Sequence, residues 1–317
     1  MTSLRVGAIL VAALAIMAPR PASAFCRTTT AAVPPNYDAE RNGCITSGLL
    51  LYWKGACVTY AINENAAQNI PFEDATRVID QAFSTWTSST CPSTGQKVGI
   101  SVTDLGAVAC SEVRYNSGSP NQNLIVFRED RWPYNDAANT LGLTTVTFNA
   151  ESGEIYDADM EINATGRNLS ITDTVPANGF DLLSVVTHEA GHFLGLAHAE
   201  VRTATMFASY KPGTTTLRSL TTDDIEGLCA IYPSDKQRVV DAKVAPNSLL
   251  EADACNPVPR HGFTKKCEEP VSQDDGCSVA PAQVASSSSS FSAPSFGVAA
   301  LAGAVVLTAA RRRRRRV

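Results

Sequence analysis

Three of the four histidines in this 317-residue chain lie within eleven residues, as His188, His192 and His198. On a helix, His188 and His192 are one turn apart, so both imidazoles can bind a single metal ion. Gly195 can adopt a positive φ and turn the chain back, which brings His198 to the same ion from another direction. Three protein ligands leave a fourth position for water, so the pattern predicts one catalytic Zn²⁺.

Glu189 is predicted to be the catalytic residue. It leaves the helix about 100° around from His188, close to the metal without being forced to ligate it. From there it can take a proton from a metal-bound water and pass it to a departing amine, as general base and then acid. The alternative, a buried helix with incidental histidines, is disfavoured because the pattern continues through Gly195 to His198.

Residues 188–198 resemble the zinc-binding motif of the metzincins. Within this motif, the sequence from Gly191 to His198 is most similar to the matrixin branch of that family. The stretches 204–210 and 220–233 also resemble the methionine turn and the closing helix of that family. The similarity covers about residues 45–233 and implies a zinc metallopeptidase domain with an α+β fold. The resemblance implies a mixed, mostly parallel five-stranded sheet, two long helices packed on it and a C-terminal helix.

The resemblance also implies roles for single residues. Met206 would form the floor beneath the zinc, and Tyr210 would line the substrate pocket, although Ala208 stands where the family has a proline. A second, structural zinc is not expected, because only His261 remains outside the cluster. Three alternating acids lie where relatives bind Ca²⁺, but such a pattern also fits a solvated strand face: Asp157, Asp159 and Glu161.

Hydrophobic periodicity along the chain predicts the helices and strands of such an α+β fold. Helices are expected at 71–86, 180–194 and 222–232, with Asp181 as a structural cap or first-turn acid. Strands are expected at 52–62, 98–102, 123–127, 144–148 and 155–162.

The N-terminus predicts export. Residues 1–24 have an early arginine, an apolar run and an Ala-Ser-Ala cleavage site, as in a secretory signal peptide. Export leads to an oxidising compartment, where the nine cysteines can form disulfides and leave one thiol over. We expect Cys255 to pair with Cys267. No cysteine-switch motif occurs. Block of the zinc by the thiol of Cys26 or Cys44 remains an alternative.

The segments outside the catalytic domain differ in composition. Residues 25–44 read as an extended N-terminal segment, and 234–295 as a poorly ordered, polar linker containing cysteines. Residues 296–317 combine a short apolar helix with six arginines, and with Cys277 they resemble myxobacterial-type sorting signals. Cleavage by sorting machinery would leave the protein secreted or on the cell surface or outer membrane. The alternative is a plain membrane anchor.

The net charge and the histidine motif together limit the classes of function that this protein can have. Without the two arginines of the leader and the six at the end, the 26 basic residues fall to 18 against 31 acids, a net charge of −13. Such a surface disfavours nucleic acid as a partner. The main hypothesis is a secreted zinc endopeptidase acting on peptides or proteins. The alternatives are a non-catalytic surface or adhesion protein of the same fold, and a zinc hydrolase with a non-peptide substrate.

Overall fold

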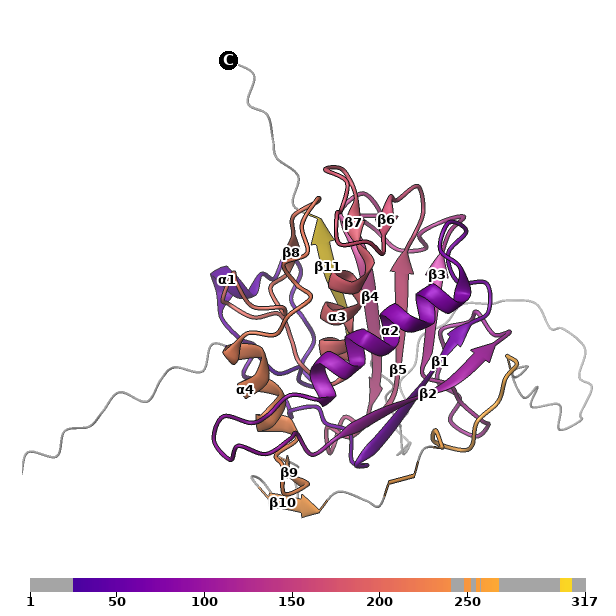
Figure 1. Cartoon of the computed structure of the whole chain (residues 1–317). Helices are drawn as coiled ribbons and strands as arrows, with labels where there is room; N and C mark the ends of the chain where they lie inside the picture. The colour runs from indigo at the N-terminus through magenta and orange to yellow at the C-terminus, as the bar shows by residue number, and fades with distance from the viewer. Residues whose placement is uncertain (1–24, 241–247, 252–254, 257, 268–302, 310–317) are drawn as a thin grey trace, which may run out of the picture.

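The computed structural model describes residues 25–240, 248–251, 255–256, 258–267 and 303–309 (Figure 1). The expected signal peptide, Cys277 and the terminal arginine cluster lie outside the described residues. Within the described ranges, no helix has both the length and the apolar character that a membrane span needs.

Five strands in the order β2-β1-β3-β5-β4 form the centre of the sheet. The pairs β1/β2, β1/β3 and β3/β5 are parallel, whereas β4 is antiparallel to β5. The expected mixed, mostly parallel sheet is confirmed. The strands are β1 Cys57–Asn63, β2 Ser101–Val108, β3 Leu124–Arg128, β4 Thr140–Phe148 and β5 Ile155–Asn163.

Strand β2 begins three residues later than position 98, where the sequence pattern places it. The reason is a contact with the C-terminal end of a distant helix, since the Gly99 N–H donates to the Tyr232 carbonyl at 2.9 Å. A Cβ at Gly99 would lie 2.1 Å from the Pro233 carbonyl oxygen, so only glycine permits this approach.

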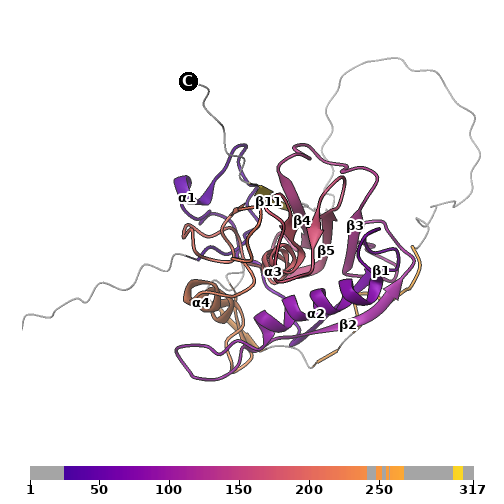
Figure 2. The same cartoon turned by 45° about the horizontal axis from the view of Figure 1, so that its top comes forward.

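Two long helices cover one face of the sheet (Figures 1 and 2). Trp86 donates from Nε1 to the Thr187 carbonyl at 2.8 Å, and Phe83 packs edge-on against Phe193 at 5.1 Å between ring centroids. These buried contacts hold the second long helix against the first. The helices are α1 Ala39–Asn42, α2 Phe72–Thr87, α3 Leu182–Phe193 and α4 Thr222–Ile231.

Helix α3 starts at Leu182, two residues later than expected, because β7 (Phe180–Asp181) pairs with β6 (Leu169–Ser170). Asp181 caps the helix by accepting a hydrogen bond from the Ser184 N–H at 2.8 Å. Its structural role is confirmed.

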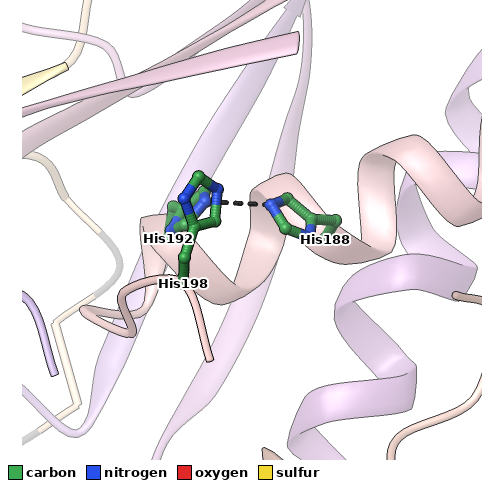
Figure 3. A group of neighbouring side chains, drawn as sticks. All are labelled: His188, His192 and His198. Carbon is green, nitrogen blue, oxygen red and sulfur yellow. Dashed lines mark hydrogen bonds between the residues drawn. The ribbon is translucent and has the colours of Figure 1, made fainter. Parts of the chain in front are cut away.

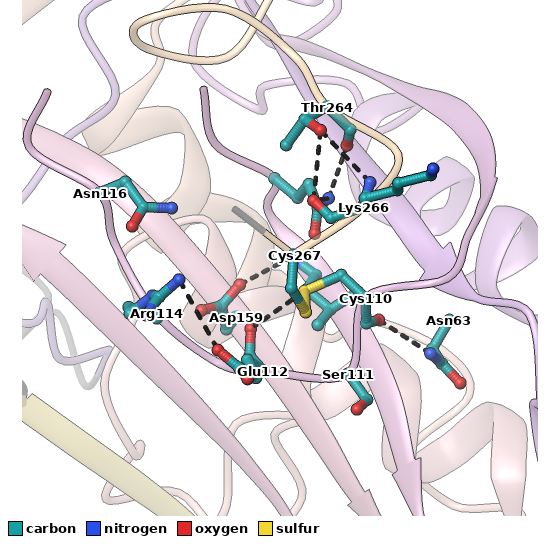
Figure 4. Close-up of a disulfide and its surroundings, with 12 residues drawn as sticks. Asn63, Cys110, Ser111, Glu112, Arg114, Asn116, Asp159, Thr264, Lys266 and Cys267 are labelled. Atoms are coloured by element: carbon teal, nitrogen blue, oxygen red, sulfur yellow. Dashed lines mark hydrogen bonds and ion pairs between the residues drawn. A yellow bond between two sulfur atoms is a disulfide. The ribbon is translucent and has the colours of Figure 1, made fainter. Parts of the chain in front are cut away.

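The opposite face of the sheet is covered by irregular chain. A second cluster of buried side chains there, including Ala61, Leu124 and Val126, packs against Phe263. The expected pairing of Cys255 with Cys267 is wrong: Cys255 is bonded to Cys57 and Cys267 to Cys110 (Figure 4). The described parts of 234–267 are therefore tied to the domain, unlike the poorly ordered linker that their polarity suggests.

Arg238, in β9 (Gln237–Val240), strengthens this attachment. Its buried guanidinium donates to the carbonyls of Trp53, Gly55 and Gly99 at 2.9, 2.9 and 3.1 Å. Strand β9 pairs with β10 (Ser248–Glu251) in a separate two-stranded sheet.

The N-terminal segment is pinned to the chain that follows α3. Thr28 N–H donates to the Gly195 carbonyl and Ala197 N–H to the Cys26 carbonyl, both at 2.9 Å. Cys26 and Cys44 are bonded to each other, so neither offers a thiol that could block zinc. The fourth disulfide joins Cys91 and Cys229, and all eight described cysteines are paired.

Residues 303–309 form strand β11, not part of the apolar helix expected at 296–310 (Figure 1). This strand pairs antiparallel with β4 and parallel with β8 (Ser209–Tyr210), extending the sheet beyond its five central strands. The segment is rich in valine, which favours a strand where a sheet edge is available.

Candidate metal centre

Figure 3 shows His188, His192 and His198 pointing toward one another. Their ring centroids are 4.7 to 5.2 Å apart, and one nitrogen of each ring lies within 4.8 Å of the other two. His188 and His192 come from adjacent turns of α3, as expected. Gly195 adopts a φ of +95°, and the turn that it permits returns His198 to the cluster.

The hydrogen bonds of the first two rings fix their tautomers. His188 Nδ1 lies 2.7 Å from the Thr205 carbonyl, and His192 Nδ1 lies 2.8 Å from the Leu196 carbonyl. Because a carbonyl only accepts, each Nδ1 carries the proton and each Nε2 presents a lone pair. The two Nε2 atoms lie 3.0 Å apart, where their lone pairs repel unless a cation lies beside both.

The third ring completes the fit. His198 Nε2 is buried and has no hydrogen-bond partner among the described residues. Burial lowers the pKa of His192 to about 4, and burial together with the other imidazoles lowers that of His188 well below its usual range. Neutral imidazoles are the form that binds metals, so these three residues suit a Zn²⁺ ion with nitrogen ligands.

Met206 lies beneath the histidines against α3. A Cβ at Gly191 would be 2.2 Å from the Met206 sulfur, so the glycine between the two helical histidines makes room for the methionine. Asp224 of α4 accepts hydrogen bonds from the N–H groups of Met206 at 3.0 Å and Thr205 at 2.8 Å. This holds the Thr205 carbonyl where it accepts from His188.

Sequence reasoning missed Asp224 as a residue that shapes this centre. A local signal was present, since Thr221 and Asp224 form a capping box at the start of α4. The pattern identifies the helix start. It does not predict that the same carboxylate also accepts hydrogen bonds from Met206 and Thr205, 18 and 19 positions earlier in the chain.

Glu189 is fully buried beside strand β4. Thr144 donates from its hydroxyl to Glu189 Oε2 at 2.7 Å, while Oε1 has no hydrogen-bond partner among the described residues. A Cβ at Gly142 would lie 2.6 Å from Oε1, so Gly142 leaves space for the carboxylate. Burial raises the pKa of Glu189 to about 8, and the Thr144 hydrogen bond opposes that rise. A divalent cation nearby would lower it further.

Tyr210 is buried and its hydroxyl is satisfied. The hydroxyl donates to the Thr214 carbonyl and accepts from the Asp181 N–H at 3.1 Å, which ties the chain after the methionine turn to the start of α3. A cavity of about 560 Å³ lies next to His198. One wall consists of Phe207, Ala208 and Ser209, and much of the rest comes from the N-terminal segment 27–45.

The three acids of β5 are not a solvated strand face, because Asp157, Asp159 and Glu161 are all buried. Glu161 accepts from Arg128 Nε at 2.5 Å and from the Tyr134 hydroxyl. The guanidinium thus supplies the positive charge that a Ca²⁺ ion would otherwise bring.

Asp159 accepts from the Leu124 N–H at 2.7 Å, close to the Cys110–Cys267 disulfide (Figure 4). Burial, then the charge of the neighbouring acid, raises the pKa of Asp157 well above its usual range. Burial likewise raises the pKa of Asp159 to about 7. Asp157 and Asp159 therefore favour a state in which one of them is protonated over a state with two negative charges.

Comparison with known proteins agrees with this geometry. The family model described as Matrixin matches residues 52–233. Metalloendoproteinase 1-MMP of Arabidopsis thaliana is 30% identical over 189 residues, which cover 59% of this chain and 46% of that protein. Matrix metalloproteinase-C of Caenorhabditis elegans is 28% identical over 200 residues, 61% of this chain and 31% of that protein.

Matrix metalloproteinase-20 of Homo sapiens is 27% identical over 184 residues, 57% of this chain and 32% of that protein. The matched region spans less than half the length of each of these relatives. The match to the family model extends over more than half of this chain and includes all three clustered histidines, Glu189, Met206 and Tyr210. The chain therefore belongs to the matrixin family.

Proposed function

We propose that this protein is an exported zinc endopeptidase, with His188, His192 and His198 as metal ligands and Glu189 as general base and acid. The observation that carries the proposal is the pair of Nε2 lone pairs facing each other at 3.0 Å, beside a third buried nitrogen that has no partner in the described part of the chain. A cation with three nitrogen ligands resolves this arrangement. When bound, zinc lowers the pKa of a coordinated water and polarises the substrate carbonyl.

The residues around Glu189 support its role. Thr144 donates to one carboxylate oxygen, and the other, Oε1, has no partner among the residues that the structure describes and can accept a proton from water. Burial raises the pKa of Glu189 to about 8, which makes the carboxylate a stronger base toward the proton of the water. The Thr205 and Leu196 carbonyls keep the protons of His188 and His192 on Nδ1, so Nε2 stays available.

An extended peptide fits this site as a substrate. Strand β4 carries both Gly142 and Thr144, the two positions that approach Glu189, and it is the last of the five central strands. A peptide that adds to that edge gains backbone hydrogen bonds and passes the carboxylate. The cavity beside Phe207 and Ser209 can then accept a side chain.

The test separates metal binding from catalysis. Glu189→Ala should keep about one zinc per chain, because the ligands remain, and should lose about 10²- to 10⁴-fold in peptide cleavage. Glu151→Ala, an exposed glutamate in the β4–β5 turn, serves as the matched control. Near-native cleavage by Glu189→Ala would overturn the mechanism. Zinc binding without any cleavage by the unaltered chain would favour the non-catalytic surface protein.

Calcium is not part of the proposal, because Arg128 and Tyr134 already engage Glu161. Export rests on the leader sequence at 1–24, and processing by sorting machinery rests on Cys277 and the arginine cluster. Mass spectrometry of the native protein tests the processing step. Peptides from beyond Cys277 in the mature cell-surface form would contradict it and favour the anchor.

A further inference from the structure

Strand β11 lies along the edge of the sheet that a peptide substrate would use. Its register with β4 runs from Gly303 opposite Val146 to Thr308 opposite Thr140. On its other side, Thr308 and Ala309 pair in parallel with Ser209 and Tyr210, the residues of β8. The segment 303–309 is thus held between β4 and the chain that follows the methionine turn (Figure 1).

The register brings this strand past the proposed catalytic carboxylate. Val305 is opposite Thr144, whose hydroxyl donates to Glu189, and Leu307 is opposite Gly142, which adjoins Oε1 of the same carboxylate. Strand β11 also contacts helix α3, which carries His188 and His192. The backbone of residues 305–307 therefore passes the part of β4 that faces the catalytic group.

Occupation of this edge excludes a second strand. Each backbone group of β4 that pairs with β11 is no longer available to another peptide, and the sheet edge offers one row of such groups. Because residues 303–309 belong to the same chain, they compete with a substrate without the cost of association in solution.

We propose that residues 303–309 are an intramolecular occupant of the peptide cleft and keep the enzyme latent until they are displaced or removed. This inference rests on the proposed function, since it requires that substrates bind along β4. Removal of the chain beyond Cys277 would take this strand away from the catalytic domain.

The test disrupts the strand by Val305→Pro together with Val306→Pro. Proline has no N–H, and two adjacent prolines remove one donor on each side of the strand. Two prolines at Val284 and Ala285, outside β11, give the matched control. A cleft that is about nine-tenths occupied should become about tenfold more active in peptide cleavage when it is freed.

Two measurements independent of cleavage use the Glu189→Ala background. Amide hydrogen exchange should show protection of the amides of residues 140–148 that face β11, lost in the 305/306 variant and kept in the 284/285 variant, whereas the amides that bond to β5 stay protected in both. A fluorescent library of extended peptides should bind the 305/306 variant about tenfold more tightly.

If residues 140–148 exchange equally in both variants, β11 does not occupy the cleft and the inference is wrong. If protection is lost but neither peptide binding nor cleavage increases, the strand does not compete with substrates, which also overturns it. If no chain with Glu189 intact cleaves peptides, the proposed function fails. Exchange and peptide binding then still decide whether β11 occupies the cleft.

Discussion

The two faces of the central sheet each bury a cluster of side chains of the types that can bind metals, but the clusters differ in what satisfies their polar atoms. On the face covered by α3, carbonyls engage the outer nitrogens of His188 and His192, whose inner nitrogens face each other at 3.0 Å, and His198 Nε2 has no hydrogen-bond partner among the described residues. On the opposite face, Glu161 has a guanidinium and a phenol, Asp159 has a backbone N–H, and among these three acids of the described chain only Asp157 Oδ1 lacks a partner. Ligand-type residues indicate a metal site where several of their lone pairs converge unmatched, and a single buried carboxyl oxygen can instead be satisfied by a proton.

The largest expected effect comes from removing one ligand on the histidine face. His192→Ala should reduce the zinc content from about one atom per chain to near zero after dialysis, because two imidazoles cannot hold the ion as three do. Metal analysis of the purified variant measures this. Asp159→Asn, on the other face, should keep its zinc, and loss of zinc from that variant would contradict the distinction between the faces.

A second prediction concerns the hydrogen bond from Thr144 to Glu189. The proposed mechanism needs the ionised carboxylate of Glu189, so kcat/KM should rise with pH through the pKa of this residue. Thr144→Val removes an interaction that lowers this pKa, and the acid limb should move to higher pH, with an activity loss of about tenfold at pH 7. Thr145→Val, one residue along the same strand and on its other face, is the control. An unshifted limb in Thr144→Val would show that the hydroxyl does not tune Glu189.

On the acidic face, the effect should appear in stability rather than activity. The pKa values of Asp157 and Asp159 are raised in the folded state, so the folded protein holds a proton that the unfolded chain releases. The free energy of unfolding therefore falls as pH rises from about 4 to 7. Asp157→Asn should reduce this dependence, because only the raised pKa of Asp159 then contributes, and should raise Tm at pH 7 by about 2–4 °C for each kcal/mol recovered. Thermal unfolding of both proteins across this range, with the exposed Asp130→Asn as control, checks the sign.

The smallest effect is expected from calcium. A site with a Kd of about 0.1 mM would add about 1.4 kcal/mol at 1 mM Ca²⁺, or about 3–6 °C in Tm. Because Arg128 already pairs with Glu161, we expect a rise in Tm of less than about 1 °C. A rise of several degrees that disappears in Glu161→Gln would show that the acidic face binds calcium after all.

The histidine cluster could be predicted because its geometry is local. Four residues of helix bring His188 and His192 to one face, and a positive φ at Gly195 is enough to return His198. The same holds for the periodicity of α2 and for the cap at Asp181. The partners of the acids in β5 could not be predicted, because the alternating sequence pattern is the same whether these acids face water or, as Glu161 does, an arginine such as Arg128.

The sequence by itself determined the cluster of three histidines, the glutamate beside it and the helix that carries them, because these depend on spacings within one helix and the turn that follows it. Only the tertiary structure decided what lies far apart along the chain. Cys57 bonds Cys255 at a separation of 198 residues, and Asp224 supports the methionine turn from another helix. Strand β11 pairs with β4 across about half of the chain. Such contacts depend on which surfaces meet when the core packs, so they cannot be predicted from local sequence patterns.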